Sequence, residues 1–231
     1  MLDVTRKENK YDIGLIETAD MKRRLGIYME SDPHNGETGY LVRSLYFDTL
    51  YDADFEQKVD GYDERQKIRL RVYSADAMTA KLEVKEKEDA LQRKRSLSIE
   101  RGEAQQMING DYRFLLRREE PLAHWLYAFL NARCYRPKCV VEYDRYAYIL
   151  EHNDTRITFD QNLRASESNY DIFDKDLVLY PVSAPGAVTM EVKYTGFLLS
   201  HLKNELNYCD KTRCSNSKYC RARMITKRGR I

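Results

Sequence analysis

The chain has 231 residues, 42% of them hydrophobic, which is enough for a buried core and favours a single domain over residues 1–231. Its 39 basic and 37 acidic residues leave a net charge of only +2, which excludes nucleic-acid binding through a general positive field. The five cysteines form no C-x-x-C pair, and neither an apolar leader nor a membrane-spanning apolar run is present, so we expect a cytoplasmic protein with reduced thiols.

The hydrophobic pattern predicts many short strands interspersed with a few helices. Apolar residues two apart indicate strands, and apolar residues three or four apart indicate helices. Thr18 is expected to cap the first helix, and the basic residues after about 224 are expected to form a disordered tail. In chain order, the predicted elements are a strand over 6–13, a helix over 18–29, a strand over 40–48, a helical turn over 50–59, strands over 67–73, 81–87 and 92–99, helices over 103–108 and 120–133, strands over 139–150, 156–163 and 176–182, a strand around 191, and helices over 197–206 and 217–223.

A cationic ladder is predicted on the strand over 67–73. Strict alternation places Lys67, Arg69 and Arg71 on one face and three aliphatic residues on the other. Side chains two residues apart on a strand lie about 7 Å apart, so the three cations repel one another unless an anion lies along them. The ladder therefore predicts an anionic ligand.

Three distant strands place a glutamate and a lysine on one face. For a single strand, the simplest interpretation is a solvated face with cross-strand ion pairs. Repetition on several strands instead favours a closed sheet with a wet, charged interior that holds a counter-ligand. The three pairs are Glu8 with Lys10, Glu83 with Lys85, and Glu191 with Lys193.

The residue types point to phosphate chemistry. Guanidinium and ammonium groups bind phosphate oxygens through charge-assisted hydrogen bonds. Carboxylates among them suit Mg²⁺ or Mn²⁺, which bridges phosphate oxygens. The sequence contains neither a Walker loop nor a kinase glycine loop, and its four histidines suggest no nucleophile constellation.

An ordered series of motifs resembles the vacuolar transporter chaperone (VTC) domain, the polyphosphate-polymerase branch of the triphosphate tunnel metalloenzymes, a CYTH-like superfamily. The resemblance covers nearly the whole chain, from about Arg6 to Arg223. The motifs are Arg6-x-Glu8-x-Lys10-Tyr11, Ser44-Leu45-Tyr46-Phe47-Asp48-Thr49, Lys67-x-Arg69-x-Arg71, Glu83-x-Lys85, Lys94-Arg95, Glu142-Tyr143-x-Arg145, Arg156-x-Thr158-x-Asp160, Glu191-Val192-Lys193 and Ser217-Lys218-Tyr219.

The resemblance implies an α+β fold in which a closed antiparallel β-barrel of about eight strands forms a tunnel, with helices packed outside. It implies an ATP:polyphosphate phosphotransferase that passes the γ-phosphoryl group of ATP to a growing polyphosphate chain, with Mn²⁺ or Mg²⁺ as cofactor. The residues implied as catalytic are Arg69, Arg71, Lys85, Arg145, Arg156 and Tyr143. The residues implied to bind phosphate or nucleotide are Lys10, Lys67, Lys94, Lys193 and Lys218.

The resemblance implies Glu191 as the metal ligand. Glu8 either joins it at the metal or orients neighbouring cations, and Glu83 is expected to form ion pairs in the tunnel wall. Eukaryotic members of the family also carry a phosphate-sensing domain and membrane helices, neither of which this sequence contains, so a partner protein stays open.

Two other functions stay open. With water as the acceptor, the same site would be a triphosphatase, for which Glu8, Glu83 and Asp160 are candidates to position the water. A non-enzymatic binder of polyphosphate or nucleic acid could use the basic runs and the 18 tyrosines. Nucleic acid is the less favoured ligand, because no row of exposed aromatic residues is predicted among the basic ones.

Overall fold

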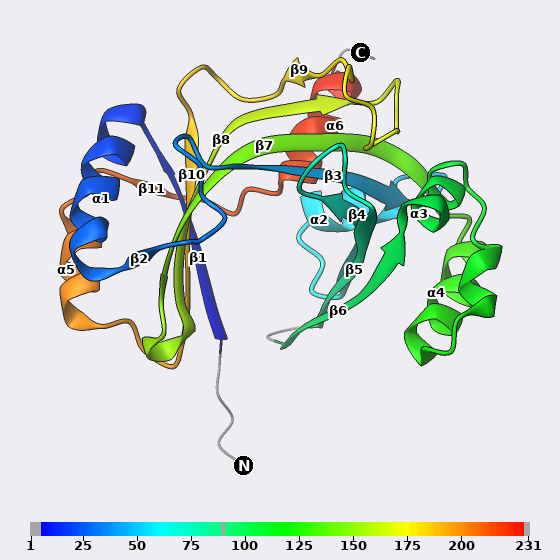
Figure 1. Ribbon diagram of the computed structural model, residues 1–231, viewed down its shortest axis with the longest axis horizontal. Coiled ribbons are helices and arrows are strands. Elements are labelled where there is room, and N and C mark those ends of the chain that lie inside the picture. The colour runs from blue at the N-terminus through cyan, green and yellow to red at the C-terminus, as the bar shows by residue number, and fades with distance from the viewer. Residues whose placement is uncertain (1–5, 89–90, 229–231) are drawn as a thin grey trace. The chain divides into compact units, whose positions relative to one another are not determined.

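The computed structural model describes residues 6–88 and 91–228 and shows a mixed α+β fold (Figure 1). Within these residues there are six α-helices and one sheet of eleven strands. The chain divides into two compact units. The first unit comprises Met1–Leu41, Tyr143–Leu163 and Ser183–Asn216, and the second comprises Val42–Glu142, Arg164–Val182 and Ser217–Ile231.

Most helices and strands lie entirely within either the first or the second unit, but three long strands contribute residues to both. These are β3 (Tyr40–Asp48), β7 (Arg136–Leu150) and β8 (Thr155–Ser166). The first unit adds β1 (Arg6–Ile13), α1 (Leu15–Tyr28), β2 (Glu30–Ser31), the 3₁₀ helix η2 (His152–Asp154), β10 (Val188–Thr195), α5 (Ser200–Asn207) and β11 (Thr212–Arg213). The second adds α2 (Ala53–Val59), β4 (Arg65–Val72), β5 (Thr79–Glu88), β6 (Leu91–Glu100), α3 (Arg101–Ile108), η1 (Arg113–Arg117), α4 (Pro121–Ala132), β9 (Tyr180–Pro181) and α6 (Lys218–Arg228).

The strands form a sheet that is not closed. Their order is β11-β1-β10-β8-β7-β3-β4-β5-β6, with β2 paired to β7 and β9 paired to β8. Closure requires a ladder on both edges of every strand, and no ladder joins β11 to β6 in the described part of the chain. The prediction of a closed barrel of about eight strands is therefore wrong, whereas the predicted antiparallel sheet with helices is confirmed.

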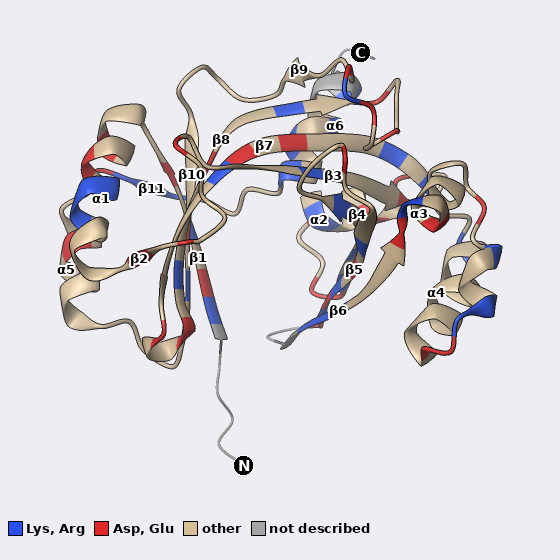
Figure 2. Cartoon of the chain, in the orientation of Figure 1, with Lys and Arg blue, Asp and Glu red and all other residues tan. Residues whose placement is uncertain are grey.

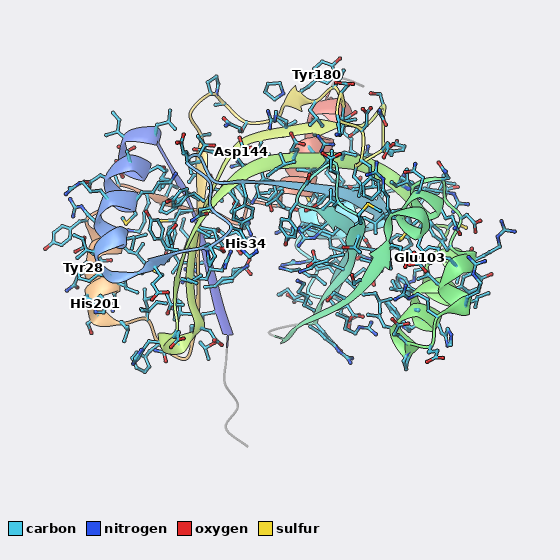
Figure 3. All side chains as sticks on the ribbon, in the orientation of Figure 1. Tyr28, His34, Glu103, Asp144, Tyr180 and His201 are labelled. Atoms are coloured by element: carbon cyan, nitrogen blue, oxygen red, sulfur yellow. The ribbon has the colours of Figure 1, made fainter. Side chains whose placement is uncertain are left out.

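In the first unit, α1 and α5 lie side by side and cover the apolar face of the sheet (Figure 1). Met21 and Leu25 of α1, together with Leu202 of α5, join a buried cluster with apolar residues of β1, β8 and β10. The two helices also meet at Tyr28 and His201, whose ring centroids are 5.1 Å apart (Figure 3). Because the apolar residues of these strands point toward the helices, the alternate residues form a separate polar face.

The prediction that Thr18 caps α1 is wrong. The helix begins at Leu15, with Gly14 as the N-cap residue. Thr18 is buried in the first turn, where its hydroxyl donates a 2.7 Å hydrogen bond to the carbonyl of Gly14. A threonine four residues into a helix can make such a bond in place of capping it.

In the second unit, α3 and α4 pack on the apolar face of β4, β5 and β6. Leu70, Leu82 and Ile99 of these strands share a buried cluster with Met107 of α3 and Leu126 of α4. A capping box begins α3, because the backbone N–H of Glu100 donates to Glu103 Oε2 at 3.0 Å (Figure 3 labels Glu103). The opposite, polar face of these strands carries the predicted ladder.

Two predictions near the C-terminus are wrong. The predicted strand over 176–182 is only the two-residue β9, whose Pro181 has no N–H to donate to a ladder. The predicted disordered tail after about 224 is instead helical to Arg228. Arg223 and Lys227 anchor this part of α6 because both form salt bridges with Asp52, at 2.7 and 3.5 Å. Residues 229–231 of the predicted tail lie outside the described residues.

No helix in residues 6–88 and 91–228 has both the length and the apolar character that a membrane crossing requires.

Candidate functional site

The strands β3 to β6 bring the cations of the second unit into register. Lys67 of β4, Lys85 of β5 and Lys94 of β6 are direct neighbours across the three strands. Like charges directly opposite one another destabilise a sheet. This lysine row therefore favours a bound anion on the polar face.

Glu83 is the centre of the arginine part of this face. Its carboxylate is 2% exposed and accepts a 2.7 Å hydrogen bond from Arg69 Nε, while Arg71 Nε lies 3.7 Å away and Lys94 Nζ also pairs with it. Burial alone would raise the pKa of Glu83, but the three cations outweigh burial and hold the pKa at about 2. These contacts match the ion-pair role predicted for Glu83. One carboxylate against three cations leaves the cluster positive.

Two hydroxyl groups of β3, for which the sequence pattern predicts no role, support the arginines. The hydroxyl of Tyr46 accepts a 3.1 Å hydrogen bond from Arg69, and that of Ser44 accepts a 3.2 Å bond from Arg71 Nε. Tyr46 is 3% exposed; burial would raise its pKa, but nearby cations led by Arg69 lower it overall. Period two on β3 places both hydroxyls on one face, but only the β3–β4 register pairs them with these arginines.

α6 brings a further predicted residue close to the lysine row. Lys67 Nζ donates a 2.8 Å hydrogen bond to Ser217 Oγ, and Lys218, the next residue, begins α6. Tyr219 follows on the same helix and stacks on Tyr46, with ring centroids 5.1 Å apart. The second unit therefore gathers six of the predicted site residues: Lys67, Arg69, Arg71, Lys85, Lys94 and Lys218.

In the first unit, charges of opposite sign alternate across β1 and β10. Glu8 pairs in register with Lys193, and Lys10 pairs with Glu191. Lys10 Nζ lies 3.0 Å from Glu8 Oε1, and Lys193 Nζ lies 2.8 Å from Glu191 Oε1. Burial would lower the pKa of Lys10, but the carboxylates, led by Glu191, raise it overall. Figure 2 shows both acidic and basic residues along β1, whereas the predicted ladder of the second unit contains only basic residues.

The two arginines of the first unit that were predicted to belong to the site are each held by an aspartate. Arg145 makes a bidentate pair with Asp160, at 2.7 and 2.8 Å, and its guanidinium lies 5.3 Å from the ring centroid of Tyr143. Burial would lower the pKa of Arg145, but Asp160 raises it well above its usual value. Arg156 contacts Asp32 at 2.5 Å. Asp32 lies in a loop far from Arg156 in sequence, so no periodic pattern could have identified it.

The structure thus places seven predicted site residues in the first unit: Glu8, Lys10, Tyr143, Arg145, Arg156, Glu191 and Lys193.

Two carboxylates of the first unit fit the predicted divalent cation. Among the described residues, no group of three or more His, Cys, Asp or Glu side chains could hold a metal ion. Mg²⁺, however, is usually held by one or two carboxylates together with substrate phosphates, and Glu191 and Glu8 supply two. Beside Glu191 on the adjacent strand β8, the buried hydroxyl of Thr158 has no hydrogen-bond partner in the described part of the chain. A buried oxygen of this kind suits a hard cation, so the donor set fits the ion.

A buried acid of α2 lies near Lys67 of the lysine row. Asp54 is 3% exposed and accepts a 2.8 Å hydrogen bond from the hydroxyl of Tyr135, which in turn accepts one from Gln66 of β4. Burial and the neighbouring carboxylate of Asp48 raise the pKa of Asp54 to about 7. The folded chain therefore holds a proton at Asp54 that the unfolded chain releases near its ordinary pKa of 3.8.

The stability of the chain should therefore depend on pH through Asp54. Below about pH 4 the acid is protonated in both the folded and the unfolded chain, so it does not reduce stability. As the pH rises from about 4 to about 7, only the unfolded chain releases the proton, and the free energy of unfolding therefore falls. Asp54→Asn should remove this penalty. The free energy of unfolding of Asp54→Asn minus that of the parent should be larger at pH 8 than at pH 5, by about 2–4 kcal/mol. Urea unfolding at both pH values measures this, with exposed Asp63→Asn as control; a difference independent of pH would contradict it.

Comparison with known proteins identifies the family of the chain. The family model described as the VTC domain matches residues 5–227, which spans both units. No curated protein matches the chain significantly.

Two solved structures share the fold at low sequence identity. A candidate adenylate cyclase from Bacillus halodurans is 12% identical, and the match covers 92% of this chain and 96% of that one with a TM-score of 0.54. A candidate adenylyl cyclase from Hippeastrum, for which a dominant triphosphatase activity is described, is also 12% identical. That match covers 94% of this chain and 96% of the other, again with a TM-score of 0.54. At this identity the likeness concerns the fold alone.

Proposed function

Because the chain belongs to the VTC domain family, we propose that it is a metal-dependent polyphosphate polymerase that transfers the γ-phosphoryl group of ATP to a growing polyphosphate chain. The observation that carries the proposal is the lysine row beside the arginines bound to Glu83. A run of cations with one buried carboxylate at its centre suits a polyanion of repeating phosphates better than a single small anion.

Each unit has a proposed role in holding phosphate. In the second unit, Arg69 and Arg71 present guanidinium forks that Glu83 and the hydroxyls of Tyr46 and Ser44 keep in place. We assign phosphate binding there to Arg69, Arg71, Lys67, Lys85, Lys94 and Lys218. In the first unit we assign it to Lys10, Arg145, Arg156 and Lys193, with Tyr143 in support.

The proposed reaction needs no protein nucleophile. A terminal phosphate oxygen of the acceptor forms a bond to the γ-phosphorus, the bond to the bridging β,γ-oxygen breaks, and ADP leaves with that electron pair. The acceptor is already anionic at neutral pH, so no strong general base is required. A divalent cation held by Glu191 and Glu8 would supply charge neutralisation at the phosphate oxygens. The lysines and arginines would position the two phosphates and stabilise the charge that develops.

A triphosphatase is the second candidate, supported by the activity described for the Hippeastrum neighbour. This function requires a carboxylate to position water. Glu83 and Asp160 are each engaged by arginines, whereas the side chain of Glu8 is 22% exposed and pairs with lysines. Glu8 is therefore the stronger candidate for that role.

Incubation of the protein with ATP and Mn²⁺ separates these functions. A gel that resolves polyphosphate, run beside an orthophosphate assay, should show a ladder with ADP and little free phosphate if the protein is a polymerase. Free phosphate without a ladder would identify a triphosphatase. If ATP is not consumed, the protein is a non-enzymatic binding module. A salt titration of tripolyphosphate binding then tests for a surface site, since a surface binder releases tripolyphosphate at moderate ionic strength.

A further inference from the structure

Thr158 of β8 carries a buried hydroxyl group that packing against its neighbours does not explain. Its neighbours Ile157 and Phe159 are buried in the apolar cluster of the first unit. Strand alternation therefore directs Thr158 to the polar face that also carries Arg156 and Asp160. The residue is 3% exposed, and within residues 6–88 and 91–228 its Oγ1 is buried without a hydrogen-bond partner.

Such a hydroxyl is costly in a folded protein. Leaving a buried donor and acceptor unsatisfied costs about 1–3 kcal/mol, and valine would fill the same space without this cost. The neighbours of Thr158 on the same face behave differently, because Arg156 contacts Asp32 and Asp160 is paired with Arg145. The orphaned hydroxyl therefore indicates a ligand that the protein atoms do not supply.

The register identifies the group beside this hydroxyl. Thr158 is the cross-strand partner of Glu191 in β10, and Glu191 is in turn the partner of Lys10 in β1. Side chains of directly opposed residues have Cβ atoms about 4.5–5.5 Å apart. Glu191 is 5% exposed, and its Oε1 contacts Lys193 Nζ at 2.8 Å. A neutral oxygen and a carboxylate oxygen thus lie together on one face, and oxygen donors of both kinds bind Mg²⁺ and Mn²⁺.

We infer that the hydroxyl of Thr158 contributes its oxygen to the binding of the divalent cation at Glu191. This inference rests on the proposed function, which assigns the cation to Glu191. Thr158 then explains why a site with few carboxylates can hold the ion before phosphate arrives. A threonine hydroxyl adds a donor without adding negative charge, which would repel the substrate.

Mn²⁺ binding to the full chain in the absence of ATP tests the inference. Titration followed by electron paramagnetic resonance should show binding weakened about 10-fold in Thr158→Val and within about twofold of the parent in Thr158→Ser, which keeps the hydroxyl. Thr189→Val is the matched control. Thr189 lies two residues from Glu191 on the same strand, but its hydroxyl donates to Asp12 Oδ1 at 3.4 Å, so Mn²⁺ binding should be unchanged.

Glu191→Gln makes the two possible failures distinguishable. If it weakens Mn²⁺ binding while Thr158→Val binds like the parent, the cation is at Glu191 but the hydroxyl is not part of its site. In that case Thr158→Val should also have a raised melting temperature, because it removes an unsatisfied group. If neither substitution changes Mn²⁺ binding, both the inference and the metal assignment are overturned.

Discussion

Glu191→Gln should reduce turnover of ATP by more than about 100-fold, which corresponds to about 2.7 kcal/mol of activation barrier. The amide keeps the size of the side chain and its contact with Lys193, but it lacks the negative charge that a divalent cation requires. Binding of tripolyphosphate without metal should stay within about twofold of the parent, because this substitution removes no cation from the polar face. Turnover assays with Mn²⁺ and calorimetric titration of tripolyphosphate measure the two effects separately.

Glu205→Gln is the matched control for this substitution. Glu205 lies on α5 of the same unit, is paired with Arg24 at 3.4 Å, and belongs to neither polar strand face. It should leave turnover unchanged. If Glu191→Gln turned over ATP as fast as the parent, Glu191 would not be the metal ligand, whatever the product of the reaction.

Arg69→Ala should weaken the binding of tripolyphosphate by about 10- to 100-fold, since a hydrogen bond to a charged group contributes about 1.5–3 kcal/mol. Its guanidinium is held by Glu83 at 2.7 Å and by the hydroxyl of Tyr46 at 3.1 Å, so it is already oriented before phosphate binds. Glu83 keeps Arg71 and Lys94 as partners after the substitution, which limits the loss of stability. Calorimetric titration, with melting temperatures measured in parallel, gives both quantities.

Arg93→Ala provides the same change of charge on the opposite face of the sheet. Arg93 and Lys94 are consecutive on β6, so their side chains point to opposite faces, and Lys94 shares the polar face with Glu83. Arg93→Ala should therefore leave tripolyphosphate binding unchanged. Equal losses in both variants would show that binding depends on overall charge and that Arg69 has no specific role.

Periodicity was sufficient to locate most strands of the sheet, but it could not determine the closure of the sheet. β1 and β3 have the predicted bounds, and β4 and β5 pair antiparallel, as the predicted antiparallel sheet requires. Closure depends on the two edge strands, and β11 is only two residues long. A two-residue strand leaves no period in a sequence, so neither its existence nor its pairing with β1 could be predicted.

The charged residues of the site could be predicted, whereas the groups that orient them could not. Lys67, Arg69 and Arg71 form a pattern within one strand, which a sequence displays directly. Their supporting groups come from other strands and become neighbours only through register, as Tyr46 does for Arg69. The sequence pattern predicts no role for Thr158 within its motif. Thr158 stands out only because its buried hydroxyl has no hydrogen-bond partner within the described residues, which a sequence cannot show.

The strand register of the first unit also limits where residues can be inserted or deleted. In β10, Met190 and Val192 are buried in the apolar cluster, while Glu191 and Lys193 alternate with them toward the polar face. Loss of one residue within this strand would reverse every following side chain, placing the lysine in the core and a valine among the charges. We therefore expect a deletion or insertion within β10 to be tolerated far less than one in a connecting loop.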